Sequence, residues 1–283
     1  MDKRIASFAE RHKTPAQQNI DGLFRFLSFS SVPSALEKHK AMLTDGWLYH
    51  TTQDTLNDPH DLKFKLKWPE VDDTQGINGF IEDLKVMLDL NGDLPIKKGL
   101  TVKDLIENNA FKRKFEATMT NFYSRARICC FTTNPKNPLF WAHYANSHKG
   151  YCVKFKTNNN PQSIISNTLK MYYSNDYPKI QFPVLSNLIS GLSVIFQKSA
   201  EWEYEDEYRS VFCADWPLQL NNNGTALSLE NDEISDIYFG KAMDEECKSK
   251  IVNLVAAGNF TPRFWNTSII KDGFDLVFTK YNV

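Results

Sequence analysis

The stretch 200–213, AEWEYEDEYRSVFC, joins a dense acidic run to a short apolar strand. Alternate positions in it are occupied by Glu201, Glu203, Glu205 and Glu207. Strand side chains alternate between two faces, so in a strand these carboxylates would share one face and repel one another. Arg209 has the same parity and is the nearest counter-charge. Taken alone, the pattern favours a solvated acidic turn that enters the strand 210–213, and the alternative is a site that holds a cation or a ligand.

The composition is that of a soluble globular protein. The chain has 283 residues, of which 42% are hydrophobic and 24% charged, with a formal net charge of −1. This charge does not indicate a nucleic-acid partner, although a local basic groove would still allow one. The chain starts without an apolar signal segment, and no apolar run is long enough to span a bilayer, so we expect a cytoplasmic protein without a membrane partner. Five cysteines without C-x-x-C spacing predict buried free thiols.

Hydrophobic periodicity outlines the fold. Alternating or continuous apolar runs predict strands at 23–29, 47–52, 127–132, 151–156, 169–173, 226–229, 234–240 and within 268–279. Helical spacing predicts helices at 2–12, from Pro33 or Ser34 to a stop at Gly46, and at 77–90, 102–124, 139–150, 161–167, 182–198 and 244–257, with a capping pattern at Thr101 and Asp104. We therefore expect a single α+β domain over residues 1–283, built on a mixed, mostly antiparallel sheet, with a helical insertion at about 75–124.

Two further segments carry candidate chemistry. Arg25 lies among apolar residues of the strand 23–29, where it either extends to water at an edge or presents a rigid fork to phosphate or carboxylate. Within 139–150, helical spacing places His143 and Tyr144 on one stripe with Phe140 and Ser147, and Trp141 beside Ala145. His143 is then either a satisfied core histidine or part of a wall that holds a planar ligand.

The tripeptide Asn57-Asp58-Pro59 predicts a tight turn in which side chains bond to their own backbone. Asp58, His60 and Asp61 are also residue types that bind metals, but no spacing rule makes a metal site specific here. Turn formation is the stronger explanation, and no metal ligand is assigned.

Several of these segments together resemble a bacterial family of domains of unknown function, number 2971. The similar boxes are Phe24-Arg25-Phe26, Asn57-Asp58-Pro59, Phe131-Thr132, Trp141-x-His143-Tyr144-Ala145 followed by His148-Lys149-Gly150, and Trp202-x-Tyr204-Glu205-x-Glu207-x-Arg209. They keep their order over about residues 23–258. The resemblance implies a shared fold but no activity, because the family has none assigned.

An arginine on an early strand (Arg25), the threonines Thr51 and Thr52 of a second strand, and the Glu205-Asp206-Glu207 turn before a later strand together show a more distant similarity to ADP-ribosyltransferases. It implies that Glu207 stabilises an oxocarbenium-like transition state and that Glu205 positions the acceptor, so we group these two residues with Arg209 as catalytic. Arg25 would bind the diphosphate of NAD, and Trp141 or Tyr144 would stack on its nicotinamide. The expected NAD-binding group comprises Arg25, Tyr49, His50, Thr51, Trp141, His143 and Tyr144.

Three hypotheses about function follow. The first is an NAD-consuming enzyme that transfers ADP-ribose to an unidentified protein or nucleic-acid acceptor, acting as a toxin or phage-defence effector. The second is a metal-dependent hydrolase or nuclease that uses Asp58, His60 and Asp61 together with His143 and Glu207. The third is a non-catalytic ligand-sensing or interaction module, in which Glu205, Glu207 and Arg209 form a structural ion network.

Overall fold

The computed structural model describes residues 3–91, 101–158, 160–184, 188–213, 218 and 220–283. The chain forms two compact units. The first unit comprises residues 1–12, 52–126 and 171–203, and the second comprises 13–51, 127–170 and 204–283. The single domain expected over the whole chain stays a prediction.

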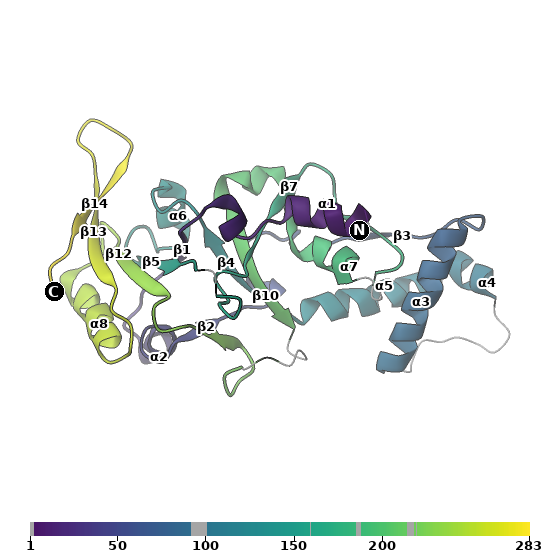
Figure 1. Cartoon of the computed structure of the whole chain (residues 1–283), viewed down its shortest axis with the longest axis horizontal. Coiled ribbons are helices and arrows are strands. Elements are labelled where there is room, and N and C mark those ends of the chain that lie inside the picture. Colours follow the sequence, from purple (N-terminus) through teal and green to yellow (C-terminus); the bar gives the residue numbers. More distant parts are fainter. Residues whose placement is uncertain (1–2, 92–100, 159, 185–187, 214–217, 219) are drawn as a thin grey trace. The chain divides into compact units, whose positions relative to one another are not determined.

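The second unit is built on an eight-stranded sheet with the order β14-β13-β12-β5-β1-β4-β10-β6 (Figure 1). Its strands are β1 (Gly22–Leu27), β4 (Ala126–Thr132), β5 (Tyr151–Lys156), β6 (Leu169–Lys170), β10 (Glu207–Cys213), β12 (Ile234–Phe239), β13 (Arg263–Ile269) and β14 (Leu276–Lys280). β12 and β13 pair in parallel, whereas β1–β4, β1–β5, β5–β12, β6–β10 and β13–β14 pair antiparallel. This arrangement confirms the expected α+β class and the mixed, mostly antiparallel sheet.

Side-chain alternation gives this sheet two distinct faces. Leu23 and Leu27 of β1 pack in one apolar cluster, together with Tyr151 of β5 and Tyr208 of β10. Phe24 and Phe26 pack in a second cluster, together with Trp141 and Tyr238. We call these sides the Leu23 face and the Phe24 face. Since strand side chains alternate, Arg25 lies on the Leu23 face, and Glu207 and Arg209, which flank Tyr208, lie on the Phe24 face.

Two helices and a small sheet cover the Leu23 face. α2 (Pro33–Leu43) contributes Met42 and Leu43 to its cluster, and α8 (Glu245–Ala256) contributes Ile251 and Val255. Pro33 suits the first turn of α2, where its missing N–H leaves no helical bond unmade, and Asp244 caps α8 by accepting from the Cys247 N–H at 2.7 Å. β2 (Trp47–Tyr49) pairs antiparallel with β11 (Ala226–Ser228). η1 (Ala16–Gln18) precedes β1.

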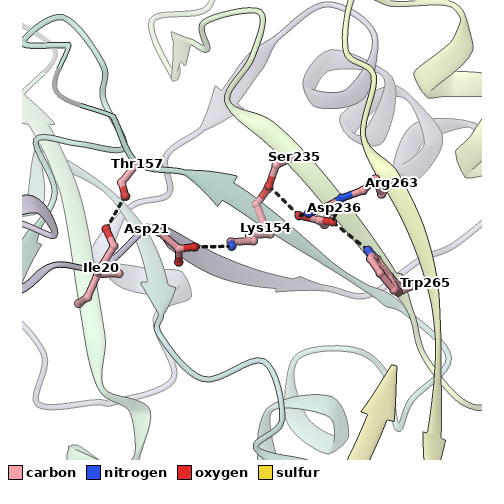
Figure 2. Close-up of polar contacts among 8 residues, drawn as sticks. All are labelled: Ile20, Asp21, Lys154, Thr157, Ser235, Asp236, Arg263 and Trp265. Atoms are coloured by element: carbon pink, nitrogen blue, oxygen red, sulfur yellow. Dashed lines mark hydrogen bonds and ion pairs between the residues drawn. The ribbon is translucent and has the colours of Figure 1, made fainter. Parts of the chain in front are cut away.

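The Phe24 face is covered near β1 by α6 (Pro138–His143). Further along this face a polar network surrounds Asp236 of β12, whose residue exposure is 1% (Figure 2). Arg263 donates to both carboxylate oxygens at 2.7 and 3.1 Å, and the Trp265 indole N–H donates at 2.8 Å. Burial raises the pKa of Asp236, but these hydrogen bonds outweigh burial and hold the pKa below its usual value. The network thereby fixes β12 against β13.

The first unit contains most of the helices. They are α1 (Lys3–Arg11), α3 (Thr74–Asn91), α4 (Val102–Glu107), α5 (Asn109–Ser124) and α7 (Leu188–Ile195), with η2 (Gln53–Thr55). Two parallel strand pairs accompany them, β3 (Lys65–Lys67) with β8 (Lys179–Gln181) and β7 (Tyr172–Ser174) with β9 (Gln197–Ser199). Its core is aromatic: Phe80, Phe115 and Phe182 surround Trp68 at ring-centroid distances of 5.3 to 5.6 Å. The helices expected at about 75–124 are thus present.

Several expected helix bounds are wrong. The helix expected over 102–124 is interrupted at Asn108, because the Asn108 side chain caps α5 by accepting from the N–H groups of Ala110 and Phe111. The capping box of Thr101 and Asp104 is confirmed. The helix expected over 182–198 is α7 alone, followed by β9, and residues 185–187 lie outside the described residues. Residues 161–167 form hydrogen-bonded turns instead of the expected helix.

The helix expected over 139–150 is also too long, since α6 ends at His143. The chain then passes through three residues with positive φ, namely Asn146 (46°), Ser147 (53°) and His148 (66°). Gly150 follows at a close backbone approach, where a Cβ atom would lie 2.1 Å from the Leu27 carbonyl oxygen. The glycine of the His-Lys-Gly box is therefore required by backbone crowding against β1.

Among the helices that the structure describes, none combines the length and the apolar character needed to cross a bilayer.

Candidate functional site

The acidic run before β10 is a 3₁₀ helix, η3 (Ala200–Glu205), in keeping with the favoured interpretation of an acidic turn that enters the strand. Consequently Glu201 and Glu203 are exposed, whereas Glu205 is buried. Asp206 then takes a left-handed conformation with φ 41°, and the strand begins at Glu207. The four glutamates thus do not share one strand face.

Glu207 and Arg209 form a buried ion pair. The Arg209 Nε–H donates to Glu207 Oε1 at 2.5 Å, and the second guanidinium nitrogen Nη2 donates to Oε2 at 3.3 Å. Residue exposures are 3% for Glu207 and 1% for Arg209. One guanidinium therefore occupies both oxygens of the expected catalytic carboxylate, in the bidentate geometry that arginine and carboxylate favour.

Glu205 is held by the tyrosine of the Trp-x-His-Tyr box. The Tyr144 hydroxyl donates to Glu205 Oε1 at 2.6 Å, and the exposed fraction of Glu205 is 4%. Burial raises the pKa of Tyr144, and the hydrogen bond to Glu205 raises it further. Tyr144 therefore remains a neutral hydrogen-bond donor at physiological pH, and its hydroxyl stabilises the Glu205 carboxylate.

Asp206 has different partners from its two neighbours. Its carboxylate accepts a hydrogen bond from the Thr133 hydroxyl and pairs with Lys170 Nζ at 2.9 Å. Each acid of the Glu205-Asp206-Glu207 segment therefore has its own donor or cation. This distribution removes the like-charge repulsion that the sequence suggests.

Trp141 and His143 differ in exposure. Trp141 has 0% exposed surface, its indole N–H donates to the Pro135 carbonyl at 2.9 Å, and its ring meets Phe26 edge-on at 5.0 Å. It is therefore a core residue that offers no surface to a ligand. His143, the last residue of α6, is exposed. Trp202, in the same family box as Glu207, lies under Lys198 Nζ at 4.5 Å.

Arg25 lies on the opposite side of the sheet from Glu207. Its Nη1 donates to the Cys130 carbonyl oxygen at 2.9 Å, and the side chain is half-buried. Across the described residues, no carboxylate lies within ion-pair distance of this guanidinium. Arg25 and the Glu207–Arg209 ion pair therefore occupy separate faces of the sheet. In the strand order, β4 lies between β1, which carries Arg25, and β10, which carries the ion pair.

Arg25 lines a cavity of about 520 Å³ in the second unit. The cavity is bounded by β1, α2, β2 and the segment before β11, and its wall includes Arg25, Ser28, Lys38, His39, Trp47 and Tyr49. Glu37 and the polar residues Asn221, Asn223 and Thr225 also line it. Its volume is within the range of pockets that hold small organic ligands.

Two buried histidines belong to the segments around this cavity: His39 of α2 lines it, and His50 directly follows β2. His39 Nδ1 lies 2.8 Å from the Tyr151 hydroxyl, and burial lowers the pKa of His39 to about 4. His50 Nδ1 lies 2.9 Å from the Leu48 carbonyl oxygen, so this nitrogen carries the proton, and Nε2 accepts from Ser210 Oγ at 2.9 Å. Burial, with the nearby positive charge of Arg25, lowers the pKa of His50 to about 3. Both rings are therefore neutral at pH 7.

The expected NAD-binding group is thus divided. Arg25 and Tyr49 line the cavity, and Tyr49 is 49% exposed. His50 has 0% exposure and does not line the cavity, while Thr51 joins Ile128 through two backbone hydrogen bonds of 2.8 Å. Trp141, His143 and Tyr144 belong to α6 and its end, on the Phe24 side of the sheet.

The Asn57-Asp58-Pro59 turn belongs to the first unit. Asp58 Oδ1 accepts from the His60 N–H at 2.8 Å, and the Asp58 carbonyl accepts from the Asp61 N–H at 3.1 Å. The carboxylate of Asp58 is thereby engaged with its own backbone, as a turn requires. Within the described ranges of the chain, no group of three or more His, Cys, Asp or Glu side chains is arranged to hold a metal ion.

Comparison with known families gives a match over part of the chain. Residues 140–210 match the model of a family described as "Protein of unknown function (DUF2971)". The matched range contains the tryptophan-histidine-tyrosine box and the Glu-x-Glu-x-Arg box, and it supports the family resemblance proposed from the sequence. Comparisons with curated proteins and with solved structures found no match. The similarity to ADP-ribosyltransferases therefore stays a prediction.

Sequence reasoning did not assign a site role to His39, Ser210 or Lys170. His39 shares the apolar stripe of α2 with Met42 and Leu43, which was the available signal that it faces inward. Ser210 and Lys170 acquire their partners His50 and Asp206 only through strand pairing and chain packing. No local pattern connects these partners.

Proposed function

We propose that the protein is a ligand-binding module that holds a small anionic molecule of nucleotide size in the Arg25 cavity. The observation that carries this proposal is a half-buried guanidinium at a cavity wall, without a carboxylate partner in the described chain. A partly desolvated cation without an ion-pair partner is unfavourable, and a bound anion offsets that cost. Guanidinium groups bind phosphate or carboxylate through two parallel N–H bonds.

The other wall residues suit the rest of such a ligand. Trp47 and the exposed ring of Tyr49 lie on β2 and offer aromatic surface for a planar group. Lys38 adds a second positive charge, and Asn223 adds amide donors and acceptors. NAD and simpler nucleotides have this combination of a planar base and phosphates, so we place NAD among the candidate ligands.

The test is isothermal titration calorimetry of the full chain with NAD, ADP and AMP, with uncharged adenosine as the comparison. We expect at least one phosphate-bearing molecule to bind and adenosine to bind at least tenfold more weakly. Arg25→Gln should weaken that binding at least tenfold, which corresponds to about 1.4 kcal/mol. Arg113→Gln removes an equivalent charge from an exposed position on α5 and should leave binding unchanged.

Two results would contradict the proposal. One is that none of the three nucleotides binds the wild-type chain. The other is that the Arg25→Gln and Arg113→Gln variants bind the nucleotide with equal affinity while circular dichroism shows that both remain folded.

Transfer of ADP-ribose is the second candidate, and its support is the strand order. Only β4 separates β10, which carries Glu207, from β1, which carries Arg25. Under this proposal β10 must shift its register so that Glu207 leaves Arg209, turns to the Leu23 face and reaches the ligand held by Arg25, and the protein then acts as a toxin or phage-defence effector. Because alternation places the two residues on opposite faces, the geometry supports binding better than transfer.

Incubation with NAD labelled in the adenylate part, with and without a bacterial lysate, tests this second candidate. Transfer predicts nicotinamide release and label on a macromolecule, both abolished by Glu207→Asp at unchanged nucleotide affinity. Nucleotide binding without nicotinamide release would leave the binding module standing and reject the transferase.

A further inference from the structure

The small sheet of β3 and β8 in the first unit presents a basic face. In its register Lys65 pairs with Lys179, Leu66 with Ile180, and Lys67 with Gln181. Residues paired in register project to the same side, so three lysines and Gln181 share one face. All four are exposed, whereas Leu66 and Ile180 are 9% and 3% exposed and face the core.

This face brings three like charges close together. Neighbouring strands lie about 4.8 Å apart, so Lys65 and Lys179 are like charges held directly opposite each other, which is destabilising. Lys65 Nζ lies 5.9 Å from the centre of the Tyr177 ring. In the described part of the chain, none of the three lysines forms an ion pair with a carboxylate.

A cavity of about 410 Å³ adjoins this face. Its lining includes Lys67, Lys179, Trp68, Gln75, Gln181 and Ser193, so two ammonium groups stand among amide and hydroxyl donors. Asp73 also lines it, and its Oδ1 accepts from the Gly76 N–H at 2.9 Å near the start of α3. The donors and cations therefore outnumber the acids around this cavity.

We propose that this cavity is a second anion site that binds a polyphosphate chain, with Lys67 and Lys179 each contacting a different phosphate. Lysine binds phosphate as a compact point charge with three donors, and two lysines on adjacent strands match a ligand with successive phosphates. A bound polyanion also relieves the repulsion between Lys65 and Lys179. All residues involved belong to the first unit, so this site is separate from the Arg25 cavity.

Calorimetric titration of the full-length Arg25→Gln variant with sodium tripolyphosphate tests the proposal without a contribution from Arg25. We expect one bound tripolyphosphate per chain, and an affinity that falls steeply as sodium chloride is raised. Adding Lys67→Gln and Lys179→Gln should weaken binding at least tenfold. Lys85→Gln with Lys103→Gln removes two exposed lysines from α3 and α4 and is the matched control. ATP should bind like tripolyphosphate if the phosphates alone are recognised, and AMP should bind at least tenfold more weakly.

A thermal scan supplies a readout that does not depend on measured affinity. Tripolyphosphate should raise the melting temperature above that in sodium chloride of equal ionic strength, and Lys179→Gln alone should raise the melting temperature in chloride by removing repulsion. Absence of tripolyphosphate binding, or equal weakening in the site and control variants, would overturn the proposal. Neither result bears on the Arg25 cavity, because Arg25 is replaced throughout the titration.

Discussion

Two arginines on strands of the same sheet have opposite surroundings. Arg209 of β10 is 1% exposed and bound bidentately by Glu207, whereas Arg25 of β1 is half-buried, donates to a backbone carbonyl and lines a cavity. The difference follows from what stands two residues away on the same strand face. Arg209 has a carboxylate there, and Arg25 has Leu23 and Leu27. An arginine among apolar strand residues is thus neutralised locally or is left for a ligand.

Among single substitutions, the largest expected effect on stability is that of replacing Arg209. In Arg209→Met, Glu207 keeps its buried position without its cation, and removing one partner of a buried ion pair typically costs about 3–5 kcal/mol. Urea denaturation should therefore show a much lower free energy of unfolding. The double variant Glu207→Gln with Arg209→Met buries no unpaired charge and should recover a large part of the loss. If Arg209→Met alone were as stable as wild type, the ion pair would contribute little to the free energy of unfolding.

Lowering the pH should reduce the free energy of unfolding through two buried histidines, His39 and His50, near the Arg25 cavity. His39 and His50 have folded-state pKa values of about 4 and about 3, below the ordinary value of 6.5. Between the folded-state pKa values and 6.5, the unfolded chain therefore binds more protons than the folded chain. The stabilisation is fully present above about pH 6.5 and is lost as pH falls toward 4. Each histidine should contribute a loss on the order of 3 kcal/mol.

Urea titrations at pH 7.5, 6, 5 and 4 measure this loss, and carboxylates contribute to the same slope. The matched comparison is His39→Asn, which removes one of the two titrations and should flatten the dependence between pH 6.5 and 4. An unchanged slope in that variant would contradict a neutral, buried His39.

The smallest expected effect on stability is the loss of Arg25. Arg25→Met removes one hydrogen bond to the Cys130 carbonyl and no ion pair, so the free energy of unfolding should change by at most about 1 kcal/mol. Ligand affinity should nevertheless fall, as described for Arg25→Gln. If Arg25→Met were as destabilising as Arg209→Met, Arg25 would be a structural residue and the comparison between the two arginines would fail.

The fold class was predictable because its signals are local. Alternation in 22–27 and 151–156, the Thr101 cap and the Asp244 helix are all determined within a few residues. Helix ends were less predictable where tertiary contacts decide them. Gly150 ends its segment because β1 lies against it, and the turn before it contains three residues with positive φ, which helical spacing does not reveal.

The candidate site was predictable only in its parts. The sequence singled out Arg25, Tyr49, Glu205, Glu207 and Tyr144, and the structure joins Tyr144 to Glu205 and places Arg25 and Tyr49 at one cavity. The sequence could not reveal that Glu207 and Arg25 lie on opposite faces of the sheet. That relation depends on which neighbours β1 and β10 share across the sheet, and strand order is a non-local property.

The short spacing of Glu207 and Arg209 has a consequence for how the chain folds. One intervening residue separates them, so their contact closes almost no loop and requires little chain entropy to be given up. The pair can form on an isolated extended segment before β10 docks beside β4. The strand then enters the sheet as an electrically neutral unit, and the slow, long-range step of pairing does not have to bring two opposite charges together from distant parts of the chain.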